Sequence, residues 1–338
     1  MQEVLQYEAS YGGAFWIVIA VAGLIYLYTN LSFASNGNKK SITRGEDIYR
    51  NYCGKTIGGA FGLFSSFFCY ISFVVMVGGA NSTLSQQWGV PNGVGAVILS
   101  ALVIMTVLFG LNGIIKALSA IGPIIIVCLL AVALYSCAFP TLGFEAGAEK
   151  ISQNAIEIEQ IGGGNPILSG MSYGGFVVLW FASFLAEIGA NNNLRKVQIG
   201  IFISALFIFG AAALCCIALI SNIDILFFAD IPAAVLANRI SPFAGTIFSF
   251  VIFIGIYSSA TPLLWSGIQH IPSPTKRNKQ IAVVIAGTIG CFIACFVPYG
   301  PLLNVAYGVN GYIGFILIAI MVFHDLRSFL SNKRLSSK

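Results

Sequence analysis

The sequence predicts an all-α protein that crosses a membrane many times, and three observations lead to this fold class. Of its 338 residues 57% are hydrophobic and only 9% are charged, whereas a water-soluble domain has roughly a quarter of its residues charged. Long stretches contain no Asp, Glu, Lys or Arg, and the basic residues cluster between them. These features exclude a soluble enzyme, a nucleic-acid-binding protein and a disordered chain.

The charge-free stretches, taken in chain order, predict nine spans. A membrane-spanning helix needs about 20 mostly apolar residues. The second stretch is long enough for two helices, separated by a polar turn between Asn81 and Asn92. The last stretch also holds two, with a break between Tyr299 and Gly311. Each of the other five stretches holds one span. The seven charge-free stretches are 9–38, 56–115, 117–144, 160–186, 197–223, 240–275 and 280–324.

The placement of basic residues predicts the orientation. Cytoplasmic loops are enriched in Lys and Arg. If the loop after the first span is cytoplasmic, every basic residue except Lys150 and Arg239 lies on that side, and Asp and Glu collect in the outer loops. The net charge of +5 then reflects topology rather than an acidic ligand. The tail, 327–338, is expected in the cytoplasm, and the N-terminus outside.

An extracytoplasmic connector, 140–166, divides the single transmembrane domain into two halves. Four spans precede it in 1–139, and five follow it in 167–326. Many transporters consist of two halves of equal span number with inverted topology. Five plus five would fit this pattern, so the first half is one span short. The polar and apolar residues of 1–10 then indicate either a surface helix or the second half of a broken span.

The opening run Gln2-Glu3-Val4-Leu5-Gln6-Tyr7 and the eighth-helix motif around Ser258-Ser259 resemble the bacterial YkvI-type membrane proteins. That group is related to the amino acid, polyamine and organocation transporters with the LeuT fold. Its first span runs through a glycine-containing break of the type GAGFASGQE, and this chain looks like the part after the break. The resemblance implies a LeuT-like 5+5 inverted repeat in the bacterial cytoplasmic (inner) membrane, with nine complete transmembrane helices and a remnant of helix one. We expect a start codon assigned too far downstream, the alternative being a truncated and inactive product.

Glu187, in the sixth helix of that scheme, is a candidate substrate-site carboxylate. A carboxylate at membrane depth costs roughly 2.5–3.5 kcal/mol on insertion scales, so it usually faces a cavity or a partner. Glu187 is expected to act beside a broken helix, with Ser183 and Gly189 marking the unwound turn. The alternative is an interfacial glutamate paired with Arg195 or Lys196.

Hydroxyl groups in two other helices are further candidates. Ser258 and Ser259 either bond back to carbonyls of the preceding turn or, as the resemblance implies, bind a sodium ion. Tyr70 is either a substrate-pocket aromatic, as the resemblance implies, or a helix-packing residue with a satisfied hydroxyl. The resemblance also implies that Gln2 and Glu3, beside the break, bind substrate.

The sequence Gly170-Met171-Ser172-Tyr173-Gly174 matches the GxSxG pattern of hydrolases. A serine nucleophile needs a base within hydrogen-bond reach. His270 and His324 are expected near the cytoplasmic face and Ser172 near the outer one, so we expect no enzyme. The eight cysteines lie mostly inside expected spans and indicate packing rather than a metal site.

These patterns favour a secondary transporter of a small polar organic solute, an amino acid or a related compound. Transport would occur by alternating access, with Na⁺ or H⁺ as the coupling ion and no other cofactor. The expected partners are the lipid bilayer and the solute, without nucleic acid. The alternative function is a non-transporting membrane sensor or interaction protein, or an inactive transporter fragment.

Overall fold

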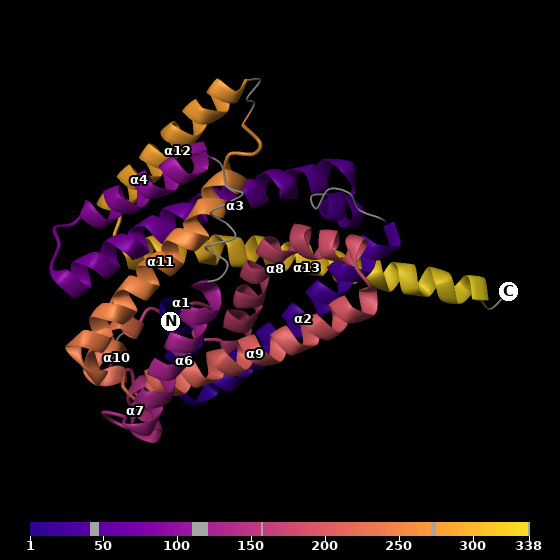
Figure 1. Ribbon diagram of the computed structural model, residues 1–338. Coiled ribbons are helices and arrows are strands. Elements are labelled where there is room, and N and C mark those ends of the chain that lie inside the picture. Colours follow the sequence, from indigo (N-terminus) through magenta and orange to yellow (C-terminus); the bar gives the residue numbers. More distant parts are fainter. Residues whose placement is uncertain (41–46, 110–120, 157, 272–274, 337–338) are drawn as a thin grey trace. The chain divides into compact units, whose positions relative to one another are not determined.

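The computed structural model describes residues 1–40, 47–109, 121–156, 158–271 and 275–336, and in this part of the chain the regular elements are all helical (Figure 1). Arg44 and Lys116, two of the basic residues expected in cytoplasmic loops, lie outside the described residues. The same holds for residue 157 of the connector and for 337–338 of the tail. The long helices are α2 (Phe15–Lys40), α3 (Asp47–Trp88), α8 (Pro166–Asn191), α9 (Leu194–Ile220), α11 (Pro242–Gly267), α12 (Lys276–Phe296) and α13 (Tyr299–Ser336). The shorter elements are α1 (Gln2–Tyr7), the 3-10 helix η1 (Ala9–Ala14), α4 (Val94–Phe109), α6 (Ile121–Ala138), α7 (Phe144–Ser152), the 3-10 helix η2 (Ile223–Ile225) and α10 (Pro232–Ile240).

Six helices in the described ranges are long and apolar enough to cross a membrane: α2 together with η1, α3, α9, α11, α12 and α13. A seventh, α8, qualifies if its two arms are one span. The helices α4 and α6 are apolar but shorter. The all-helical, multi-pass character expected from composition is therefore present, while the count of nine and the inverted repeat stay predictions.

Capping residues explain where three long helices begin. The Asn165 side chain accepts hydrogen bonds from the backbone N–H groups of Ile167 and Leu168, and Pro166 occupies the first turn of α8. Ser241 caps α11, again followed by a proline, and Thr275 caps α12. These side chains satisfy amide groups that have no partner inside the helix.

Two expected breaks are present but narrower or shifted: the one expected between Asn81 and Asn92 is confined to residues 89–93, and the one expected between Tyr299 and Gly311 lies just before Tyr299. The polar run beginning at Asn81 is helical, and α3 continues to Trp88. Its side chains bond outside the helix: Asn81 Nδ2 donates to Asn92 Oδ1 (2.5 Å), and Gln86 pairs with the backbone of Ile231. In the last stretch the chain breaks just before Tyr299, where α13 begins.

The expected unwinding of the sixth helix at Ser183 and Gly189 is wrong. Both residues are helical, and α8 instead bends by 55° between its arms Pro166–Leu179 and Phe181–Asn191. A Cβ on Gly189 would collide with the backbone of Ala34 in α2. Gly189 therefore allows α2 and α8 to approach closely.

The chain divides into two compact units, and each takes segments from both expected halves. Unit 1 comprises Met1–Phe15, Ser66–Gln160 and Ala211–Ala306; unit 2 comprises Trp16–Ser65, Ile161–Gly210 and Tyr307–Lys338. In unit 1, α4 and α12 lie side by side (Figure 1), and buried residues such as Phe73 and Leu99 form the core. The unit 2 core includes Phe33, Tyr49 and Leu317.

Candidate functional site

A cavity of about 420 Å³ lies within unit 1. Its walls come from six places in the chain: α1, the middle of α3, the start of α6, the start of α10 with the residues before it, the middle of α11, and the first residue of α13. The polar side chains among its walls are Gln2, Glu3, Asp230, Ser258, Ser259 and Tyr299. The cavity thus brings together four of the seven side chains singled out from the sequence.

The helix α1 supplies one polar wall. Its residues Gln2 and Glu3 both line the cavity, and the Glu3 side chain is 26% exposed. The Gln2 Oε1 atom is buried without a hydrogen-bond partner in the described part of the chain. This wall therefore offers a carboxylate and an unused amide oxygen.

Hydrogen bonds hold α1 and the following 3-10 helix η1 to the end of the connector. Gln6 Nε2 donates to Glu159 Oε2 (3.0 Å), and Gln160 Nε2 donates to the Ser10 carbonyl (2.9 Å). Asn304, near the start of α13, also donates to Glu159. One carboxylate of the connector therefore joins α1 to α13 within unit 1.

The helix α11 contributes its hydroxyl pair to the same cavity. Ser258 Oγ donates to the Gly255 carbonyl at 2.8 Å, the back-bond usual for a helical serine. This bond uses its proton and leaves its oxygen lone pairs available. Ser259 lines the same cavity beside it.

Asp230 and Tyr299 were missed as site residues by the sequence analysis. Both also line a second, polar cavity of about 430 Å³ in unit 1, so they form a wall shared by the two spaces. Ser82 Oγ donates to Asp230 Oδ2 (3.0 Å). The Tyr299 ring lies against Gly78 and Gly79, where added Cβ atoms would come within 3.5 and 3.3 Å of it. The available signals were an acidic loop residue and an aromatic at a helix start, neither of which is specific.

The other three predicted residues do not line this cavity. Tyr70 OH donates to the Ala286 carbonyl of α12 (3.0 Å), which is the packing alternative weighed for it. Ser183 and Glu187 lie on α8 in unit 2, beyond its bend. The Glu187 side chain is exposed. Their substrate roles stay predictions.

The GxSxG sequence in α8 forms close helix contacts. Cβ atoms on Gly170 and Gly174 would collide with Val18 and Ile25 of α2, and Ser172 Oγ lies against Gly311 of α13. On that helix His324 is 13 residues further along, or about 20 Å at 1.5 Å per residue. The motif therefore brings α8 close to α2 and α13.

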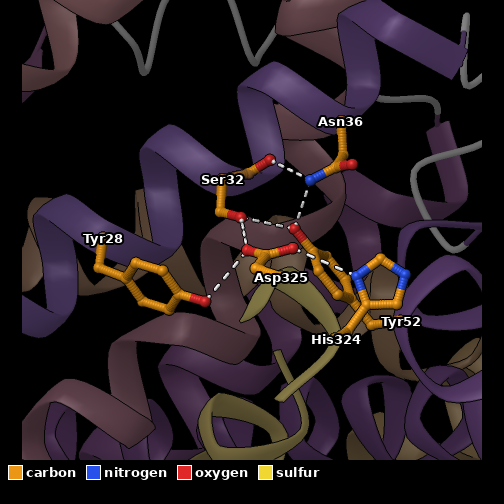
Figure 2. Close-up of polar contacts among 6 residues, drawn as sticks. All are labelled: Tyr28, Ser32, Asn36, Tyr52, His324 and Asp325. Atoms are coloured by element: carbon orange, nitrogen blue, oxygen red, sulfur yellow. Dashed lines mark hydrogen bonds and ion pairs between the residues drawn. The ribbon is translucent and has the colours of Figure 1, made fainter. Parts of the chain in front are cut away.

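Unit 2 contains a polar cluster built around Asp325 (Figure 2). The Asp325 carboxylate accepts hydrogen bonds from Tyr28 OH (3.1 Å) and Ser32 Oγ (2.7 Å). His324 Nδ1 lies 3.2 Å from its other oxygen. Ser32 and Asn36 both bond to Tyr52 OH at 2.6 Å. The cluster therefore ties α2, the start of α3 and the far end of α13 together.

Comparison with solved structures identifies the fold. MhsT in complex with L-phenylalanine matches with a TM-score of 0.60 at 16% sequence identity, over 95% of this chain and 84% of that chain. A mutant of the Eremococcus coleocola manganese transporter matches with a TM-score of 0.53 at 14% identity, over 96% of this chain and 80% of that chain. This chain has the fold of these LeuT-fold transporters.

The likeness is one of fold, and the neighbours are transporters rather than enzymes. The sequence matches no protein-family model and no curated protein. In the part of the chain that the structure describes, no group of three or more His, Cys, Asp or Glu side chains is arranged to hold a metal ion.

Proposed function

We propose that the protein is a secondary transporter of a small polar organic solute that carries an amino group. The observation that carries this proposal is the unit 1 cavity, which joins Gln2 and Glu3 of α1 to Ser258 and Ser259 of α11. The fold shared with transporters supports it. The similarity of the opening segment to YkvI-type proteins is a further reason to expect an amino acid or a related compound.

The charge of the cavity favours a cationic group on the solute. Two carboxylates, Glu3 and Asp230, are among its described walls together with one cationic group, the amino group of Met1, which lies 3.6 Å from Glu3 Oε2, so these three groups carry a net charge of −1. Opposite charges within a few ångströms attract strongly where water is scarce. A protonated amino group on the solute would balance the negative charge that the Met1 amino group leaves, and the hydroxyls of α11 would either accept its remaining hydrogen bonds or bind a coupling cation.

Uptake into proteoliposomes tests the proposal. The full chain is reconstituted and supplied with radiolabelled amino acids and simple amines, with and without an inward sodium gradient. We expect uptake of at least one amino-bearing compound, and a loss of about tenfold or more in Glu3→Gln, since a buried charged hydrogen bond is worth roughly 1.5–3 kcal/mol. Absence of uptake for the whole panel would favour the non-transporting alternative.

The same assay tests the ion role of the α11 hydroxyls. If sodium stimulates uptake, Ser258→Ala and Ser259→Ala should abolish the stimulation, because each removes an oxygen ligand. Ser266→Ala is the matched control, since it lies two turns further along the same helix and outside the cavity walls. Unchanged sodium stimulation in both cavity variants contradicts the ion role.

A further inference from the structure

Glu8 is a fully buried carboxylate at an irregular point of the chain. It lies between α1 and η1, and its side chain has no exposed surface. The Cys216 thiol of α9 donates to Glu8 Oε2 across 3.1 Å. The other oxygen, Oε1, has no hydrogen-bond partner in the described part of unit 1. One of the two carboxylate oxygens is therefore buried without a hydrogen bond in this part of the chain.

The groups around Glu8 provide little compensating charge. From α9 it faces the thiols of Cys216 and Cys215, and the positive group that acts on it is the amino group of Met1. The helix α7 packs against η1 and carries Lys150 in its last turn, but no ion pair with Glu8 is found among the described residues. An ionised carboxylate in such surroundings costs far more than a neutral carboxyl group.

The backbone beside Glu8 departs from regular helix. The α-helix α1 has six residues and ends there, and in η1 Gly12 adopts φ 54° and ψ −129°. A Cβ at Gly12 would lie 3.1 Å from the Ala148 carbonyl oxygen, so this turn packs tightly on α7. Discontinuous helices are the elements at which transporters of this kind bind ions and move. Glu8 thus lies at a joint between two helices, beside a turn that departs from regular helix geometry.

We infer that Glu8 is the proton-binding carboxylate that couples solute movement to a proton gradient. The carboxylate takes up one proton to form a neutral carboxyl group when the joint opens to one side of the membrane, and it releases that proton when the joint opens to the other. No electrons are transferred. This inference rests on the proposed transport function, but protonation itself can be measured without a solute.

Infrared difference spectra of the full chain in lipid nanodiscs, recorded between pH values, detect the proton through the C=O band of a protonated carboxyl group. At neutral pH we expect the C=O band of one protonated carboxyl group in the unmodified protein, still present in Glu145→Gln and lost in Glu8→Gln. Glu145 is an exposed carboxylate on α7 and serves as the matched control. A band that persists in Glu8→Gln, or that is missing from the unmodified protein, overturns the assignment.

A substitution at Cys216 tests the contact itself. The thiol donates to the carboxylate and favours its ionised form, so Cys216→Ala should shift the loss of the band to higher pH, by about one unit or less for one weak hydrogen bond. A band that titrates at the same pH in this variant means that the thiol does not act on Glu8.

Transport assays distinguish a failure of proton coupling from a failure of the proposed transport function. One-proton coupling gives about tenfold accumulation per unit of pH gradient. Glu8→Gln should lose this accumulation for the amino-bearing solute found above, while exchange of labelled for unlabelled solute continues. Accumulation that survives in Glu8→Gln overturns the coupling role. A protein that neither accumulates nor exchanges any compound refutes the transport function and with it the coupling, while the infrared band reports independently whether Glu8 binds a proton.

Discussion

At the scale of single residues, Asn222 connects several elements of unit 1 through five hydrogen bonds of its side chain. It is fully buried. Its amide nitrogen donates to the carbonyls of Ser136 and Ala218, and its oxygen accepts from the backbone and hydroxyl of Thr141 and from Arg239. One amide group therefore holds the end of α9 to α6 and to the last turn of α10.

We expect Asn222→Ala to lower the free energy of unfolding by about 2–4 kcal/mol, because several buried polar groups lose their partner at roughly 0.6–1 kcal/mol each. Thermal unfolding in detergent, followed by circular dichroism, provides the measurement. The control is Asn191→Ala at the end of α8, an exposed residue whose side chain donates to the Glu187 carbonyl, and a change below about 0.5 kcal/mol is expected for it. Equal losses in the two variants contradict the structural role of Asn222.

At the scale of elements, α8 and α13 are joined by glycine faces in unit 2. A Cβ on Gly314 would collide with the carbonyl of Gly175, and one on Gly175 would collide with the carbonyl of Gly311. Close approach of this kind maximises van der Waals contact between helices in a membrane, where lipid already solvates apolar side chains. Asn310 adds a hydrogen bond to the Phe176 carbonyl at 2.9 Å.

Gly314→Ala should therefore destabilise the protein by about 1–3 kcal/mol, the usual range for overpacking. Gly308→Ala on the same helix meets nothing within 4 Å and should be neutral, or stabilising by up to about 1 kcal/mol, because alanine favours the helix. The melting temperatures of the two variants, measured in the same detergent, test this expectation. Similar values for both variants would mean that α8 and α13 are not in close contact here.

The elements also show which predictions a sequence supports. Some local signals correspond to the structure because their cause is local: Asn165 and Pro166 begin α8 through contacts within one turn, although the sequence analysis placed no helix start there. The break expected between Tyr299 and Gly311 lies just before Tyr299. Polar residues misled at Asn81, because its partner is on another segment. Gly189 suggested an unwound turn, but a glycine is needed there because the backbone of α2 lies too close for a Cβ atom.

At the scale of the whole molecule, the candidate site follows the same rule. The resemblance gave Gln2 and Glu3 as substrate candidates and Ser258 and Ser259 as ion candidates, but their meeting in one cavity is seen only in the structure, because these residues lie far apart in sequence. Asp230 and Tyr299 gave no specific pattern and join the cavity through tertiary packing. Glu8 carried no motif either, since only its burial and its neighbour Cys216 mark it.

The distribution of charge predicts which side of the membrane each end of the second half faces. Five long helices, α8, α9, α11, α12 and α13, lie between the connector and the tail. If each crosses once, the connector and the tail lie on opposite sides, and the basic tail lies in the cytoplasm because Lys and Arg are retained there.

Reporter fusions measure this arrangement. Alkaline phosphatase, which is active only outside the cytoplasm, should be active when inserted after Gly163 and inactive when fused after Lys338. Green fluorescent protein, which folds in the cytoplasm, should fluoresce only at the second position. The reversed pattern would invert the orientation, and equal activity at both positions would show that an even number of these helices crosses the membrane. Because the two reporters respond oppositely to location, poor expression of one fusion cannot be mistaken for either orientation.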